Sequence, residues 1–303
     1  MASIVVDSRT IELSNLDKVL FPDAGLTKGD LVHYYRRISN TMLPYLRNRP
    51  LNMHRFPDGI QGEGFFQQHA SDYFPPWIER VRVSRKEDGT VEHVVCQDAA
   101  TLVYLANQAC ITPHVWLSRI DALDRPDRLV FDLDPPTSDF EPVRAAARHL
   151  RSFLEELELP AFVMTTGSRG LHVLIPLDRS EGFDAVRSFA RDLATALARR
   201  HPQQLTVEQR KAQRNDRVFL DYLRNSYGQT AVAPYSVRAR PGAPVATPLE
   251  WHELAHRSLG PQSYTLRNIF RRLGQKADPW RDLSDCSISL TAARKRLGKA
   301  HWG

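Results

Sequence analysis

The stretch from Arg128 to Leu177 constrains this chain more than any other, because it joins two unusual motifs through one helical pattern. It begins RLVFDLDPP and ends FVMTTGSRGLHVLIPL. Side chains alternate along a strand, so Asp132 and Asp134 project from one face while Leu133 enters the core. Neighbouring carboxylates repel each other unless a cation lies between them, and oxygen ligands suit Mg²⁺ or Mn²⁺. The motif predicts a divalent-cation site, and the alternative is that two aspartates simply end a strand.

The second motif predicts two strands, at residues 162–164 and 171–175, joined by the turn TTGSRG. Such a turn offers backbone N–H groups, the Ser168 hydroxyl and the Arg169 cation to an anion. His172 lies just inside the following strand. An ordinary glycine-containing hairpin is the alternative. Beside a carboxylate pair, a phosphate-binding turn is the favoured interpretation.

The composition is that of a globular protein large enough to bury a sizeable core. The chain has 303 residues, 42% hydrophobic and 25% charged, and no long uncharged apolar run. An acidic residue at Asp7 and the lack of an apolar segment argue against a signal peptide. The three cysteines, Cys96, Cys110 and Cys286, are widely spaced and form no zinc or disulfide pattern. We therefore expect a cytosolic protein with no membrane partner.

The excess of basic residues is small but uneven. Forty-one lysines and arginines against 35 acidic residues give a net charge of +6, with basic clusters at 267–276 and 294–299. Such clusters favour a polyanionic partner, although they are also common on solvated helices. Lys18 and Lys28 lie near the start of an amphipathic helix predicted from Thr27 to about Leu46. Both are candidates for binding phosphate.

Two adjacent aromatics, Phe65 and Phe66, follow a glycine-rich loop. Both cannot face the core of one strand, so one is expected to be exposed for stacking on a base. Packing of both beneath the loop is the alternative. His54 lies in an alternating strand pattern, and His114 is either a site residue or a core histidine.

The remaining patterns indicate an α/β (α+β) fold. Helices are expected at 99–109, 142–157 and 183–200, and a strand at 218–222 carries a third carboxylate, Asp221. After Pro248 the pattern is mostly helical, with Trp251, Trp280 and Trp302 as packing anchors. We expect one domain over residues 1–303: a central β-sheet bearing three aspartates, a second smaller sheet region, and flanking helices.

The order of these motifs resembles that of the archaeo-eukaryotic primase superfamily. Asp132-x-Asp134 comes first, then Ser168-x-Gly170-x-His172, then Asp221. The segments LDKVLFP, RFPDGI, RPDRLVFDLDPP, GSRGLHV and FLDYLRN are similar to the polymerase domain of bacterial DNA ligase D. The similarity runs from about Leu13 to Trp251 and implies a primase-type fold. No ligase or nuclease segment accompanies it, which favours a stand-alone relative or an isolated domain.

The resemblance implies roles for residues at matching positions. Asp132, Asp134 and Asp221 would be the catalytic, metal-binding triad for two Mn²⁺ or Mg²⁺ ions. Six residues are assigned to the incoming nucleotide, either by the resemblance or by their place beside these motifs. They are Ser168, Arg169, His172, His114, Arg238 and Arg214. The residues assigned to DNA, including a downstream 5′-phosphate, are Lys18, Lys28, His54, Arg55, Phe65 and Phe66.

One position departs from the family pattern. His54 appears where some members carry a third lysine in the 5′-phosphate pocket. Histidine is largely neutral at pH 7, so we expect weaker phosphate recognition, or compensation by Arg55. We also expect the preference for a 5′-phosphate to strengthen as pH falls towards 6 and His54 becomes charged.

The function implied is a template-dependent nucleotidyltransferase that fills short gaps and extends DNA ends, with ready use of ribonucleotides. Its partners would be gapped, nicked or 3′-overhang DNA with a 5′-phosphate, NTPs or dNTPs, and Ku with a separate DNA ligase. The alternative within the superfamily is a primase-polymerase that initiates chains de novo in excision repair or replication restart.

Three readings outside this class fit less of the sequence. A haloacid-dehalogenase phosphatase requires glycine after its second aspartate, whereas Pro135 follows Asp134 here. A nucleotide-sugar glycosyltransferase leaves Phe65, Phe66 and Asp221 without a role. A non-catalytic end-bridging protein would not depend on the three aspartates.

Overall fold

The computed structural model describes residues 2–84 and 89–300 and divides into two compact units. Unit 1 comprises Met1–Asp121, Thr230–Ala246 and Tyr264–Leu273. Unit 2 comprises Ala122–Gln229, Thr247–Ser263 and Gly274–Gly303. The expectation of a single domain over residues 1–303 stays a prediction.

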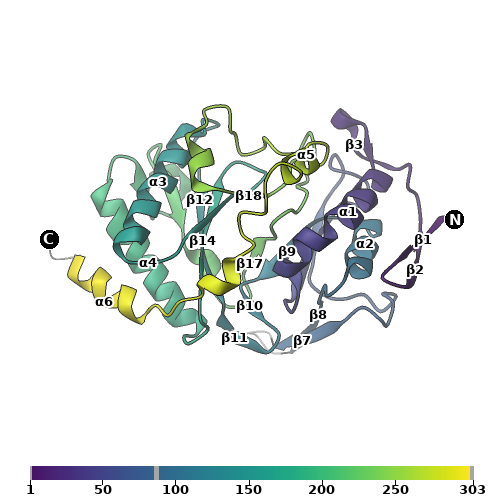
Figure 1. Cartoon of the computed structure of the whole chain (residues 1–303), viewed down its shortest axis with the longest axis horizontal. Helices are drawn as coiled ribbons and strands as arrows, with labels where there is room; N and C mark the ends of the chain where they lie inside the picture. The colour runs from purple at the N-terminus through teal and green to yellow at the C-terminus, as the bar shows by residue number, and fades with distance from the viewer. Residues whose placement is uncertain (1, 85–88, 301–303) are drawn as a thin grey trace. The chain divides into compact units, whose positions relative to one another are not determined.

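Unit 1 is built on a four-stranded sheet in the order β17-β9-β5-β6, with every neighbouring pair antiparallel. These strands are β5 (Leu51–Arg55), β6 (Phe65–Gln67), β9 (Cys110–Trp116) and β17 (Thr230–Val232). Shorter strands pair in sequence order: β1 (Ala2–Val6) with β2 (Arg9–Leu13), β3 (Val19–Phe21) with β4 (Leu26–Thr27), and β7 (Arg80–Ser84) with β8 (Thr90–Val94). The strand β10 (Ser118–Arg119) and the 3-10 helix η1 (Pro22–Ala24) complete the unit's N-terminal part. Figure 1 shows β17 in green and the elements before residue 121 in purple to blue.

Two helices pack together over this sheet region, α1 (Lys28–Leu46) and α2 (Ala99–Asn107). A capping box starts α1, as predicted. The Thr27 hydroxyl accepts from the Asp30 N–H at 3.3 Å, and the Asp30 carboxylate accepts from the Thr27 N–H at 2.7 Å. Reciprocal bonds of this kind satisfy two helix donors that would otherwise lack partners. They fix the start of the helix at Lys28.

Unit 2 is built on a six-stranded sheet in the order β15-β16-β12-β14-β13-β18. Only the β15–β16 pair is parallel. The strands are β12 (Arg128–Asp134), β13 (Phe162–Thr165), β14 (Leu171–Pro176), β15 (Leu205–Thr206), β16 (Val218–Asp221) and β18 (Thr247–Leu249), with β11 (Ala122–Pro126) outside this sheet. Helices α3 (Glu141–Glu156) and α4 (Phe183–Arg200) pack against each other and against β12 (Figure 1).

The strand β12 is the buried centre of this sheet. Its residues Leu129, Val130, Phe131 and Leu133 are at most 1% exposed. Strands covered on both faces read as nearly continuous apolar runs, and this run is what the sequence shows. The predicted α/β architecture, with a central sheet, a second smaller sheet and flanking helices, is confirmed.

The prediction of a mostly helical segment after Pro248 is wrong for the described residues. That part holds only short elements: η4 (Trp251–Ala255), α5 (Ile269–Leu273), η5 (Leu283–Cys286) and α6 (Thr291–Ala300). The Trp251 indole donates to the Ala161 carbonyl at 2.8 Å, and the Trp280 indole to Val163 at 3.1 Å. In this segment, hydrogen bonds from the two indoles to distant backbone carbonyls hold chain that is mostly not helical. Trp302 lies outside the described residues.

Among the described residues, no helix is long and apolar enough to span a bilayer.

The Asp98 cap of α2 gives a stability prediction. Its carboxylate accepts from the Thr101 N–H at 2.7 Å and pairs with Arg9. Burial opposes ionisation, but the Thr101 bonds and the Arg9 charge lower the pKa of Asp98. Asp98→Ala should cost about 1–2 kcal/mol at pH 7, within the range for a lost N-cap. Because the folded-state pKa is depressed, this contribution is present above the ordinary value of about 4 and is lost as pH falls through the lowered pKa.

Urea denaturation across pH 7 to 3 measures this difference. Asp98→Asn keeps the capping oxygen and should lose less than half as much stability as Asp98→Ala. Equal losses in the two variants would show that the Arg9 pair, and not the cap, carries the effect.

Candidate active site

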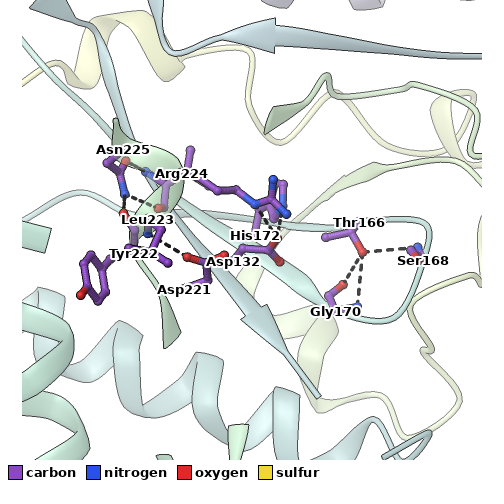
Figure 2. Close-up of polar contacts among 11 residues, drawn as sticks. Asp132, Thr166, Ser168, Gly170, His172, Asp221, Tyr222, Leu223, Arg224 and Asn225 are labelled. Atoms are coloured by element: carbon purple, nitrogen blue, oxygen red, sulfur yellow. Dashed lines mark hydrogen bonds and ion pairs between the residues drawn. The ribbon is translucent and has the colours of Figure 1, made fainter. Parts of the chain in front are cut away.

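The carboxyl end of β12 gathers the predicted catalytic residues of unit 2. Strand register places Asp132 directly opposite His172 on β14 and directly opposite Asp221 on β16. Asp134 lies two residues further along β12 on the same face, opposite Phe219. Figure 2 shows Asp132 between Arg224, His172 and Asp221. Three neighbouring strands therefore bring together residues that lie up to 89 positions apart in the chain.

Asp132 is buried and held by two cationic or potentially cationic partners. The Arg224 Nε donates to its Oδ2 at 2.7 Å, and the His172 Nε2 lies 3.5 Å from the same oxygen. Only 8% of the Asp132 side chain is exposed. Burial alone would raise its pKa, but His172 and Arg224 together lower the pKa of Asp132 below its ordinary value. Asp132 is therefore an ionised carboxylate at neutral pH.

Asp134 and Asp221 lie in the opposite electrostatic situation. Burial, followed by the negative charge of Asp132, raises the pKa of each carboxyl group. The Asp221 Oδ1 accepts from the Leu223 N–H at 2.8 Å, which partly offsets this effect. Half-buried carboxylates that raise one another's pKa form a site where added positive charge is favourable. The donor set fits a divalent cation.

Two residues at this site were not assigned from the sequence, Arg224 and Asn225. Both lie in η3 (Leu223–Asn225), directly after β16. The Asn225 amide accepts from the Val130 N–H at 2.8 Å and donates to the Val130 carbonyl at 2.8 Å. It thereby continues the pairing of β12 beyond the end of β16 and fixes η3 against the sheet. The signal in the sequence was their position within FLDYLRN, three and four residues after Asp221.

The turn between β13 and β14 is organised around the Thr166 hydroxyl (Figure 2). This oxygen accepts from the Ser168 and Gly170 N–H groups at 3.3 Å and donates to the Gly170 carbonyl at 3.1 Å. A Cβ atom at Gly170 would collide with the Leu133 carbonyl oxygen, so glycine allows the turn to lie against β12. Ser168 is half-buried and Arg169 is exposed beside it.

Arg214 is held near the carboxylates from the loop before β16. Its Nε donates to the Glu208 carbonyl at 3.1 Å, and its guanidinium lies over the Phe219 ring at 4.1 Å. Its positive charge acts to lower the pKa of both Asp134 and Asp221. The assignment of Arg214 to the incoming nucleotide stays a prediction.

In unit 1, a ring cluster connects three strands. The His54 ring stacks on Phe66 at a centroid distance of 4.1 Å, and Phe66 meets His114 edge-on at 5.3 Å. The exposed fraction is 57% for Phe66 and 45% for Phe65, so the expectation of an exposed aromatic is met twice over. Arg238 lies close enough to influence His54 electrostatically.

The expectation that His54 becomes charged near pH 6 is wrong. Burial and the Arg238 charge lower the pKa of His54 to about 4. The imidazole is therefore neutral at pH values well above 4, whereas a lysine at this position would be charged at neutral pH. Its role in this structure is that of an aromatic ring stacked on Phe66.

The proposed phosphate-binding lysines differ in environment. Lys28 is buried, and its Nζ donates to the Asn107 carbonyl at 3.0 Å and to the Ser14 hydroxyl at 3.2 Å. Burial and the nearby charge of Lys18 lower the pKa of Lys28. Lys18 forms an exposed ion pair with Asp58 at 2.6 Å. Arg55, the proposed substitute for a third lysine, is engaged by Gln108 and Gln67 instead.

Among the residues that the structure describes, no three His, Cys, Asp or Glu side chains form a ready-made metal site. Asp132 is paired with Arg224 instead. The metal-binding role of the aspartate triad stays a prediction.

Comparison with known proteins identifies the family of this chain. The family described as LigD, primase-polymerase domain, matches residues 27–280. The multifunctional non-homologous end joining protein LigD of Pseudomonas aeruginosa is 36% identical over 293 residues, covering 95% of this chain and 35% of that protein. The bifunctional non-homologous end joining protein LigD of Bacillus subtilis is 32% identical over 274 residues, covering 90% of this chain and 44% of that protein. This chain thus spans less than half the length of either relative.

A solved structure gives the same result. The polymerase domain of Mycobacterium tuberculosis ligase D, in complex with DNA, superposes with a TM-score of 0.85 at 30% sequence identity. The match covers 92% of this chain and 99% of that one. The family model and the structural match together place the chain in the primase-polymerase class of DNA nucleotidyltransferases. The chain belongs to the LigD primase-polymerase domain family.

Asn225 provides a test of how the site is positioned. Asn225→Leu keeps a similar volume but leaves the buried Val130 N–H and carbonyl without their side-chain partners. Each unsatisfied buried group costs about 1–3 kcal/mol, so we expect a loss of about 2–5 kcal/mol in the free energy of unfolding.

Denaturant unfolding measures this loss. The matched control is Ser226→Ala, which removes only a hydroxyl bond to the Leu223 carbonyl and should cost about 1 kcal/mol or less. Equal stability of Asn225→Leu and wild type would show that Asn225 does not hold η3 in place.

Proposed function

We propose that this chain is a template-dependent nucleotidyltransferase that fills short gaps and extends DNA ends during non-homologous end joining, and that it uses ribonucleotides readily. The observation that carries the proposal is the face-sharing set of Asp132, Asp134 and Asp221 within a LigD-type fold. The names of the relatives support the repair pathway, and the DNA complex of the M. tuberculosis domain supports the substrate.

In this proposal the three aspartates hold two divalent ions, Mn²⁺ or Mg²⁺. When bound, such ions neutralise triphosphate charge and activate a primer 3′-hydroxyl. Asp134 and Asp221 supply the carboxylates whose pKa is raised, and Asp132 supplies one that is already ionised. His172 orients Asp132 from the neighbouring strand.

The other proposed substrate contacts are to the triphosphate and the sugar of the incoming nucleotide. Ser168 and Arg169 lie on the turn fixed by Thr166, where a hydroxyl and a cation can meet the triphosphate. We assign Arg214 and Arg238 to phosphate contacts as well, and His114 to the sugar. Ku and a separate DNA ligase are the proposed protein partners.

A primer-extension assay tests the proposal as a whole. Gapped, 3′-overhang and unprimed templates are compared with NTPs and dNTPs. Extension of gapped and overhang substrates, with ribonucleotides used at least as well as deoxynucleotides, is the expected result. Chains initiated on the unprimed template alone would favour the primase-polymerase alternative.

The metal site gives a prediction with two readouts. Because burial and the negative charge of Asp132 raise the pKa of Asp134 and Asp221, their charges destabilise the metal-free fold at neutral pH. Asp134→Asn and Asp221→Asn should therefore unfold at the same temperature as wild type or higher without metal. The rate of primer extension should fall by at least about a hundred-fold. Mutation of residues that only support metal ligands already lowers metal affinity or activity by about ten- to a hundred-fold, and these substitutions change the proposed ligands themselves.

Thermal unfolding with and without Mn²⁺ separates the two effects. Mn²⁺ should raise the unfolding temperature of the wild type more than that of either variant. The matched control is Asp184→Ala, an exposed aspartate in the first turn of α4, which should keep both activity and the Mn²⁺ response. Primer extension by Asp134→Asn at the wild-type rate would contradict the assignment of Asp132, Asp134 and Asp221 as the catalytic triad.

We further propose that Lys18 and Lys28 recognise a downstream 5′-phosphate. Burial and the charge of Lys18 lower the pKa of Lys28, so an anion bound by both lysines would be favourable. Lys18 must first leave its exposed ion pair with Asp58, which is worth little because solvent screens it.

This proposal predicts a pH dependence of definite sign. His54 is neutral above its pKa of about 4, so it adds no charge between pH 8 and 6. The second ionisation of a terminal phosphate lies near about pH 6. The preference for a 5′-phosphorylated gap over a 5′-hydroxyl gap should therefore weaken as pH falls from 7.5 to 5.5, as the phosphate loses charge.

Binding measured by fluorescence anisotropy tests this prediction. Lys28→Ala should remove most of the preference, whereas Asp58→Asn should strengthen it by freeing Lys18. His54→Phe should leave the pH profile unchanged. A preference that grows at low pH and disappears in His54→Phe would restore a charged role for His54.

A further inference from the structure

The two short strands β3 and β4 form a hairpin that carries Lys18 and Lys28 at its base and η1 at its tip. At the base, the Lys28 N–H donates to the Lys18 carbonyl at 2.8 Å. Along β3, the Ile60 N–H donates to the Leu20 carbonyl at 2.9 Å. Backbone hydrogen bonds therefore hold the β3–β4 hairpin at its base and along one side, and its tip is a fixed point in unit 1.

A second loop of unit 1, residues 238–243, carries Arg238, and we name it the arginine loop. It is closed at its base by backbone pairing. Val237 pairs with Val245 in an antiparallel bridge, and the Arg238 N–H donates to the Pro244 carbonyl at 2.7 Å. The base of the arginine loop is thus fixed by its own hydrogen bonds, whereas its tip depends on other segments.

The tip of the β3–β4 hairpin bonds the arginine loop and a later segment of the same unit. The Asp23 carboxylate accepts from the Gly242 N–H at 2.6 Å. The next residue of η1, Ala24, accepts at its carbonyl from the Arg267 guanidinium, also at 2.6 Å. Two neighbouring residues of one short turn therefore connect segments that lie more than 200 positions away in the chain.

The backbone conformation at the tip of the arginine loop needs such support. Gly242 and Ala243 have φ angles of 77° and 50°. This left-handed region is unfavourable for alanine, and such a conformation persists only where the surrounding structure holds it. The Leu266 N–H donates to the Ala243 carbonyl at 3.0 Å, and Asp23 bonds the preceding residue. The shape of the loop therefore rests on contacts from outside it.

The arginine loop brings Arg238 close to the ring cluster of unit 1. Burial is the larger cause of the lowered pKa of His54, and the positive charge of Arg238 is the second cause. The same charge acts on the buried Tyr35 hydroxyl. Since charges interact strongly only at short range in a solvated protein, a displaced loop would move the guanidinium away from this position.

We propose that Asp23 is a positioning residue, which holds the Gly242 N–H so that the arginine loop presents Arg238 to the triphosphate of the incoming nucleotide. Asp23 contacts no substrate in this proposal and acts through the backbone of the loop. A carboxylate suits this role, because hydrogen bonds to an ionised acceptor are stronger than those to a neutral one. The proposal rests on the proposed function, from which it takes the assignment of Arg238 to the triphosphate.

Hydrogen-exchange mass spectrometry tests the contact without any substrate. Asp23→Ala should speed exchange in the peptide that covers residues 238–243, because the Gly242 N–H loses its acceptor. Asp23→Asn keeps an acceptor oxygen and should retain most of the protection. The matched control is Glu12→Ala, which removes an exposed carboxylate from β2 and should leave exchange in this peptide unchanged.

Steady-state kinetics on gapped DNA test what the contact does for the reaction. Asp23→Ala should raise the KM for the incoming NTP by roughly two- to ten-fold, the effect of losing one hydrogen bond of ordinary net strength. The kcat should change by less than about two-fold, because a phosphate contact of this kind is made in the ground state and the transition state alike. Asp23→Asn should lie between wild type and Asp23→Ala, and Glu12→Ala should match wild type.

Affinity for a 5′-phosphorylated gap should be the same in all variants, because Lys18 and Lys28 lie at the other end of the hairpin. Exchange at the wild-type rate in Asp23→Ala would overturn the proposal, since the bond would not hold the loop. Faster exchange with an unchanged KM would overturn it too, since Arg238 would not depend on the bond. Absence of extension by the wild type would count against the proposed function, whereas an active wild type with an indifferent Asp23 counts against this inference alone.

Discussion

The ion pair between Asp132 and Arg224 is the interaction on which the site of unit 2 depends. Three carboxylates face the same side of a buried sheet, and such charges would drive one another towards protonation. His172 and Arg224 together keep Asp132 ionised against its burial, and Arg224 is itself held by the charges of all three aspartates. Asn225 anchors the turn that carries Arg224 by bonding both backbone groups of Val130. The sheet thus builds an acidic site with one internal cation, leaving Asp134 and Asp221 with raised pKa values that further positive charge would relieve.

Backbone register explains why distant sequence motifs meet. Asp132 lies opposite both His172 and Asp221 because β12 pairs with β14 on one side and β16 on the other. A slip of one residue in either pair would turn the partner side chain to the opposite face. Gly170 makes the close approach of the β13–β14 turn to Leu133 possible, since any Cβ there would strike the backbone. Strand register and the β13–β14 turn therefore position the site together. Both depend on backbone pairing and on Gly170, and not on the side chains proposed to bind substrate.

The parts of the site that were predictable from sequence are those encoded locally. Alternation placed Asp132 and Asp134 on one face, and the capping box set the start of α1. The inclusion of Asp221 came from the family resemblance and not from a local pattern. Arg224 and Asn225 were missed because their roles arise only when β16 pairs with β12. The segment after Pro248 was predicted as helical from its composition, yet the Trp251 and Trp280 indoles tie it to the backbone before and within β13. Long-range hydrogen bonds of that kind leave no periodic signal in the chain.

At position 54, histidine in place of the lysine found in some family members changes the charge of the side chain and the contacts it can make. A lysine there would carry charge at every physiological pH, but burial and Arg238 hold the imidazole neutral down to a pKa of about 4. A neutral flat ring can stack where an ammonium cannot, and His54 lies nearly parallel to Phe66. On the next pair of the same two strands, Arg55 supports Phe65 from the other face. The edge of this sheet therefore carries a stacked pair of rings on one face and a contact between a guanidinium and a ring on the other. Under the proposal that unit 1 binds a 5′-phosphate, its charged contacts are Lys18 and Lys28, and His54 contributes none.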